Sequence, residues 1–219
     1  IYQIPLLLYK KKGIGQWYFG QDAKSMAKEE NGICLDDFYE KAFLGEPVEI
    51  EDMSYEAKDL LAVFLRKILM LPRRLSGEMK ITSMGITISN LNAKTTAVLR
   101  EVMKKIGIEK EQFFMIDHKE SFYYYALNQD KELWVHDVAL FSYEGENLTE
   151  YYLHRNENTT PQMIELTEKE YAQLNGDRDL EFTSMIKDAF SGKIVSSVFL
   201  VGNGFEGDWM KQSIQMLCR

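Results

Sequence analysis

Three glycines near the C-terminal end of the sequence have a spacing that could bring backbone N–H groups to an anion. Gly202, Gly204 and Gly207 follow the apolar run from Val195 to Val201, and a helical pattern begins at Trp209. A strand, a glycine turn and a helix in this order can present donors to a bound phosphate. A tight turn that needs positive φ angles would explain the same glycines without a ligand, so the motif alone leaves both interpretations open.

Asp137 is a second candidate, because it lies in the apolar segment L-W-V-H-D-V-A-L-F. Its carboxylate could hold a metal-bound water, or it could form hydrogen bonds at the end of a strand, and we favour the second interpretation. The three histidines, His118, His136 and His154, include no closely spaced pair of ligands. We therefore expect no metal site.

The overall composition excludes some classes of function. A net charge of −8 over 219 residues leaves no basic surplus to neutralise phosphates, so we expect no nucleic-acid partner. No apolar run reaches membrane-spanning length, and we expect no insertion into a membrane. Cys34 and Cys218 lie far apart in the sequence. Two distant cysteines suit a reducing cytoplasm, where we expect the protein to reside.

Hydrophobic periodicity predicts an α/β protein. A helix is expected to begin at Ser54, with Leu60, Phe64 and Ile68 on its buried face. The other main elements are strands at 81–89, 113–116, 133–143, 148–153, 162–167 and 198–201, the last of them central in its sheet, and helices at 93–106, 121–127, 168–174, 180–190 and 209–217. This order predicts two lobes, residues 1–130 and residues 131–219, which divide near 128–131. Because the sequence starts inside an apolar strand without Met, we expect it to be a fragment.

Several segments occur in an order that is typical of one superfamily. They are the hairpin I-P-L-L-L and W-Y-F-G-Q-D-A-K, the strand and helix I-T-I-S-N-L-N-A-K-T-T-A, the run L-W-V-H-D-V-A-L-F-S-Y-E-G and the turn V-F-L-V-G-N-G-F. In this order they resemble the nucleotide-binding domains of the actin, sugar-kinase and heat-shock-chaperone (DnaK-like) superfamily. The last two segments correspond to its second phosphate motif and its adenosine motif.

This resemblance implies a two-lobed actin-like ATPase fold, with mixed sheets and flanking helices, whose first phosphate hairpin would precede Ile1. It places Asp137 at the aspartate of the second phosphate motif, and it implies ATP or ADP with Mg²⁺ as the ligand. It also implies that Gly202, Asn203, Gly204 and Phe205 contact the nucleotide. The phosphate motif is degenerate, because the residues from Val138 to Phe141 replace its glycines. Side chains at these positions would block the close backbone approach that a phosphate requires.

Two functions follow as hypotheses. The first is a protein-interaction or regulatory module without efficient ATP hydrolysis, which binds nucleotide weakly or not at all and has an unknown protein partner. Association into a homo-oligomer is compatible with this function. The alternative is an active ATPase or kinase whose first phosphate loop lies upstream of Ile1, and Asp137 and the two glycines at 202 and 204 favour it.

Overall fold

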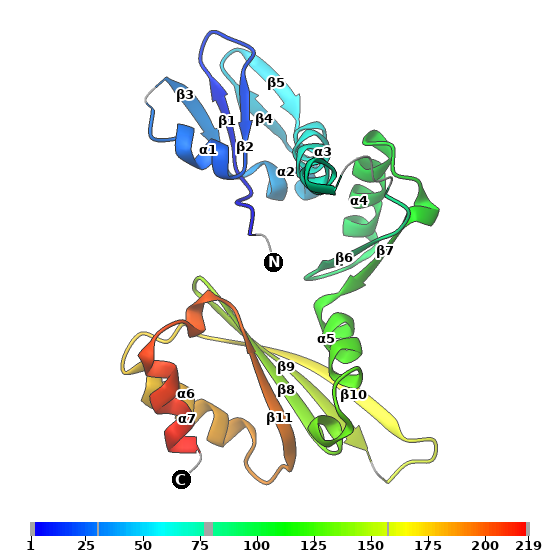
Figure 1. Ribbon diagram of the computed structural model, residues 1–219, viewed down its shortest axis with the longest axis vertical. Coiled ribbons are helices and arrows are strands. Elements are labelled where there is room, and N and C mark those ends of the chain that lie inside the picture. Colours follow the sequence, from blue (N-terminus) through cyan, green and yellow to red (C-terminus); the bar gives the residue numbers. More distant parts are fainter. Residues whose placement is uncertain (1–2, 30, 77–80, 157, 218–219) are drawn as a thin grey trace. The chain divides into compact units, whose positions relative to one another are not determined.

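The computed structural model describes residues 3–29, 31–76, 81–156 and 158–217 of a mixed α/β protein (Figure 1). The chain divides into two compact units, Ile1–Ile116 and Asp117–Arg219. This division lies before the expected one near 128–131, because the helix α5 (His118–Leu127) belongs to the second unit. Phe122 and Ala126 of α5 lie in one buried cluster with Leu153, a residue of the second unit's sheet.

The first unit contains short sheets and four helices within its described residues. Its elements are β1 (Leu8–Lys11), β2 (Trp17–Phe19), α1 (Gln21–Met26), β3 (Gly32–Leu35), α2 (Phe38–Leu44), β4 (Pro47–Ile50), β5 (Met53–Glu56), α3 (Ala57–Ser76), β6 (Met84–Ile88), α4 (Ala93–Lys105), the 3₁₀ turn η1 (Lys110–Gln112) and β7 (Phe113–Asp117). The strands form a sheet in the order β2-β1-β3 and two pairs, β4-β5 and β6-β7.

Helix α3 contributes much of the core of the first unit. Leu60 and Phe64 are buried in that core, and Ile68 is partly buried against it, as the helical spacing predicts. The Phe64 ring packs against the Phe38 ring of α2, with centroids 5.4 Å apart. The helix begins at Ala57 rather than at Ser54, because Ser54 lies in β5 and pairs with Glu49 of β4. Pairing with a neighbouring strand outweighs the local preference of this segment for a helix.

The second unit is built on one four-stranded sheet with the strand order β10-β9-β8-β11. Its elements after α5 are η2 (Lys131–Trp134), β8 (Asp137–Glu144), β9 (Asn147–Asn156), β10 (Met163–Tyr171), α6 (Arg178–Ala189), β11 (Val195–Val201), η3 (Asn203–Phe205) and α7 (Asp208–Leu217). Strands β8, β9 and β10 form an antiparallel meander, whereas β11 pairs in parallel with β8 after the α6 crossover.

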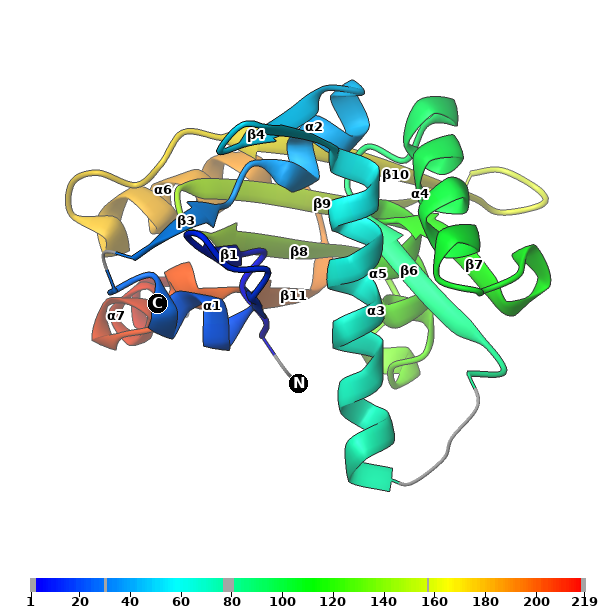
Figure 2. The ribbon, with the colours of Figure 1, turned by 90° about the horizontal axis from the view of Figure 1, so that it is seen from above.

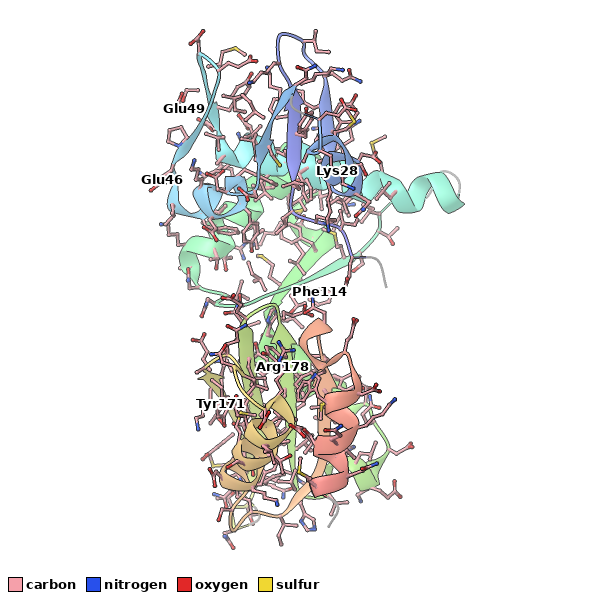
Figure 3. The ribbon with its side chains drawn as sticks, turned by 90° about the vertical axis from the view of Figure 1, so that its left-hand side faces the viewer. Lys28, Glu46, Glu49, Phe114, Tyr171 and Arg178 are labelled. Carbon is pink, nitrogen blue, oxygen red and sulfur yellow. The ribbon has the colours of Figure 1, made fainter. Side chains whose placement is uncertain are left out.

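Helices cover both faces of this sheet (Figures 1 and 2). Phe182 of α6 and Met210 of α7 pack against Phe141 and Tyr143 on one face. On the opposite face, Phe122 of α5 packs against side chains of β8 and β9. Figure 3 labels Tyr171, at the end of β10, on the same side of the sheet as α6.

Two expectations about strands are wrong. Strand β11 was expected at the centre of its sheet, but in the described part of the chain it lies at one edge and pairs only with β8. Residues 168–174 were expected to form a helix, but β10 extends to Tyr171 because its register with β9 continues to the pair of Tyr171 and Leu148. Among the helices of the described ranges, none combines the length and the apolarity that crossing a bilayer requires.

Candidate functional site

The carboxylate of Asp137 is the centre of a polar cluster at the start of β8. The antiparallel register places Ala139 opposite Tyr152, so Asp137 and His154 lie on one face of the sheet. The Tyr152 hydroxyl donates to Oδ2 of Asp137 at 2.5 Å, and the Arg155 amide donates to Oδ1 at 3.0 Å. His154 Nδ1 lies 2.9 Å from Oδ2 and 3.0 Å from Oδ1. Both carboxylate oxygens are therefore occupied by partners from β9.

These contacts keep Asp137 ionised although the residue is only 6% exposed. Burial raises the pKa of its carboxyl group, but the hydrogen bonds from Tyr152, His154 and the Arg155 amide outweigh burial and lower this pKa below its usual value. Burial, together with the hydrogen bond to Asp137, raises the pKa of the Tyr152 phenol. The pair is thus a charged carboxylate held by a neutral phenol at physiological pH.

His154 is the one member of this cluster that is half exposed, with 47% of its side chain accessible. An ionised carboxylate only accepts hydrogen bonds, so Nδ1 of His154 must carry the proton that lies between the two groups. When the ring carries this one proton, Nε2 is its proton acceptor. A histidine oriented by a carboxylate in this way can act as a general base toward a bound hydroxyl or water.

A cavity of about 560 Å³ lies beside His154 at this end of the sheet. Its lining is polar and carries charges of both signs: His136, Asp137, Tyr152, His154, Arg155, Asn156, Asn158, Glu165, Thr167, Gly192, Lys193 and Ile194. The Lys193 ammonium lies 4.3 Å from the centroid of the Tyr152 ring. The Arg155 guanidinium is already engaged, because it donates to the carbonyls of Trp134 and Val135 at 2.9 and 2.6 Å. Within the described ranges, no group of three or more His, Cys, Asp or Glu side chains could hold a metal ion.

The glycine turn lies at the other end of the sheet, and packing accounts for its residues. Gly202 has a φ of 106°, and a Cβ added there would meet the backbone carbonyl of Tyr143. A Cβ on Gly204 would meet the Tyr143 ring. The Asn203 side chain accepts a hydrogen bond from the Gly145 amide at 3.2 Å. Phe205 packs on Tyr143, with ring centroids 5.6 Å apart.

The structure therefore separates the two sites that the sequence predicts. Strands β8 and β11 run in parallel with Val195 beside Asp137 and Val201 beside Ser142. At about 3.3 Å of rise per residue, β8 separates Asp137 from Tyr143 by about 20 Å. Gly202, Asn203, Gly204 and Phe205 thus lie beside Tyr143 and the turn after it, whereas Asp137 lies at the opposite end of β8.

Mg²⁺ with ATP or ADP, the ligand that the resemblance implies, does not fit the residues of this unit. Asp137 has no carboxylate oxygen left without a partner, and both glycines are needed for contact with Tyr143. Sequence reasoning missed Tyr152 and His154 as partners of Asp137. Both could have been identified from the register of the hairpin. If Glu144 pairs with Asn147, antiparallel pairing places His154 opposite Asp137.

Comparison with known proteins adds one relationship. No curated protein matches the chain. A family model described as "Family of unknown function (DUF5716) C-terminal" matches residues 1–219. The chain therefore belongs to the DUF5716 C-terminal family.

Proposed function

We propose that this chain is a protein-interaction or regulatory module on a divergent, two-lobed actin-like fold, without efficient ATP hydrolysis. The mixed sheet of the second unit, with helices on both faces, is the type of core that the resemblance to the actin and DnaK-like superfamily implies. The division of the chain into two compact units supports two lobes in this proposal. A cytoplasmic location is part of the same proposal, and the free thiol of Cys34 is compatible with it.

The separation of Asp137 from the glycine turn is the observation that carries this proposal. Phosphoryl transfer depends on Mg²⁺ and backbone donors that converge on one phosphate group. Here Tyr143 lies against the glycines, and the aspartate is at the other end of the strand. Exposed side chains support the interaction role, since Tyr124 is 55% exposed on α5 and Met163 is 54% exposed on β10. Aromatic residues and Met are enriched at protein–protein interfaces.

Calorimetry and phosphate release test the proposal. We expect wild-type protein to bind neither ATP nor ADP in the presence of Mg²⁺ with an affinity better than the millimolar range. The rate of phosphate release from ATP should equal the rate measured without protein. The Asp137→Ala variant should give this same rate. Turnover clearly above that background and lost in Asp137→Ala would contradict the proposal and support the alternative, an active ATPase. Thermal melting of each variant shows whether it is folded under the assay conditions.

A further inference from the structure

Strand β10 is a long and regular edge of the sheet, with four charged residues among its nine: Glu165, Glu168, Lys169 and Glu170. In the described part of the chain it pairs with β9 alone, over nine consecutive residue pairs without a bulge. All of its residues except Leu166 and Tyr171 are exposed. An edge of this length presents a row of backbone groups that can pair with another strand.

The opposite edge of the sheet differs. The register of β11 shifts between Val195 and Ser197, which interrupts its regular pairing. The Ser196 hydroxyl accepts a hydrogen bond from the His136 amide, and the Ser197 hydroxyl donates to the Leu133 carbonyl at 2.6 Å. A bulge is one of the ways in which proteins protect a sheet edge. Of the two edge strands of this sheet, β10 is therefore the one that is suited to pairing with another strand.

Two charged residues of β10, Glu165 and Lys169, complement a second copy of the same strand. If two β10 strands pair antiparallel about a twofold axis at Thr167, all nine residues overlap. Glu165 of each copy then lies opposite Lys169 of the other, and Met163 lies opposite Tyr171. Opposite charges and a thioether beside an aromatic ring are both favourable pairs. Moving the axis to Glu168 would place that carboxylate opposite its own copy, which is unfavourable.

We propose that β10 pairs with β10 of a second copy, so that two second units form one continuous eight-stranded sheet. Such an interface is isologous, with the same strand contributed by both partners. A twofold axis perpendicular to the sheet keeps α6 and α7 of both copies on the same face. The inference rests on the proposed role as an interaction module, and it names a second copy of the chain as the partner.

Sedimentation and charge reversal test this pairing. We expect wild-type protein to form a dimer whose dissociation constant rises about tenfold for Lys169→Glu and for Glu165→Lys, because each change replaces two attractive pairs by two repulsive ones. The double variant Glu165→Lys/Lys169→Glu should restore the wild-type constant. Lys187→Glu, an exposed position on α6, makes the same charge change away from β10 and should have no effect.

Cysteine cross-linking tests the register. In a background with Cys34→Ser and Cys218→Ser, Thr167→Cys places two thiols directly opposite each other at Cα separations of about 4.5–5.5 Å, which a disulfide can join. Lys169→Cys places the two thiols about 13 Å apart and should not form a disulfide. Equal cross-linking at both positions would overturn the proposed register.

A wild-type protein that stays monomeric at millimolar concentration would overturn the dimer. That result would leave the nucleotide experiments to be judged separately, because they measure nucleotide binding and phosphate release rather than association of the protein. Turnover lost in Asp137→Ala would instead contradict the proposed function, whatever the oligomeric state.

Discussion

The hydroxyl of Tyr152 donates to Oδ2 of Asp137 at 2.5 Å, which joins the second strand of the hairpin to the first residue of β8. The carboxylate is buried and ionised, and among the described residues its hydrogen-bond partners come from β9. The arrangement fixes the ends of two strands and also orients His154 toward the cavity. The same hydrogen bonds therefore serve the stability of the sheet and the geometry of the candidate site.

Replacement of Tyr152 by Phe should destabilise the protein by about 1.5–3 kcal/mol, because the change removes a hydrogen bond to a charged group. The measurement is denaturant unfolding followed by circular dichroism. Tyr124→Phe is the matched control, since Tyr124 is 55% exposed, and its effect should be close to zero. Equal destabilisation by the two changes would show that the hydrogen bond to Asp137 contributes nothing specific.

The stability that Asp137 contributes should depend on pH. Its folded-state pKa is lowered, so this contribution is fully present above the unfolded-state pKa of about 3.9 and is lost as the pH falls through the folded-state value. Asp137→Asn should be less stable than wild type at pH 7, and the gap should narrow as the pH falls from 5 toward 2. The difference in stability is measured as the unfolding free energies of both proteins at several pH values. A gap that stays constant over this range would contradict the lowered pKa.

A methyl group at Gly204 should disturb the packing of the glycine turn. The added Cβ would meet the Tyr143 ring, so Gly204→Ala should cost about 1–3 kcal/mol. Gly15→Ala is the control, because no atom lies within 4 Å of a Cβ there and its φ is ordinary. Thermal melting of both variants checks the expectation, and an unchanged melting temperature for Gly204→Ala would mean that Tyr143 can move aside.

Truncation of Phe64 should leave a cavity in the core of the first unit. The residue is 1% exposed, so Phe64→Ala should cost about 3–5 kcal/mol. Val63, the preceding residue on α3, is 44% exposed, and Val63→Ala should cost much less. Denaturant unfolding of the two variants compares the two faces of the same helix. Similar losses would mean that the buried face of α3 is assigned wrongly.

Elements with strong local signals could be predicted from the sequence. The Asn92 side chain accepts hydrogen bonds from the Lys94 and Thr95 amides and begins α4, which lies within the helix expected at 93–106. Gly107 follows this helix with a φ of 78°, as expected for a glycine after a helix end. Strands were expected at 133–143 and 148–153, and β8 and β9 form a hairpin there through the turn at 144–147. In each case neighbouring residues supply the determining hydrogen bonds or backbone geometry.

Features that depend on distant partners could not be predicted. Glu168, Lys169 and Glu170 favour a helix in isolation, but pairing with β9 keeps them in a strand. The buried carboxylate of Glu150 accepts a hydrogen bond from Tyr171 at 2.6 Å, which holds the end of that strand to the sheet. The relation between Asp137 and the glycine turn also depends on distant parts of the chain. Sequence order placed Asp137 and Gly202 in two motifs of one site, whereas strand direction places them at opposite ends of the sheet.

The parallel pairing of β11 with β8 also has a consequence for synthesis on the ribosome. His136 and Ser196, which lie side by side at the start of this pairing, are 60 positions apart in the sequence. At about 5–20 residues per second, roughly 3–12 s pass between the synthesis of these two residues. The hairpin of β8 and β9 can form during this interval, but the other edge of β8 then has no β11 beside it. The nascent chain therefore passes through a stage in which the strand that carries Asp137 is open to pairing with other chains.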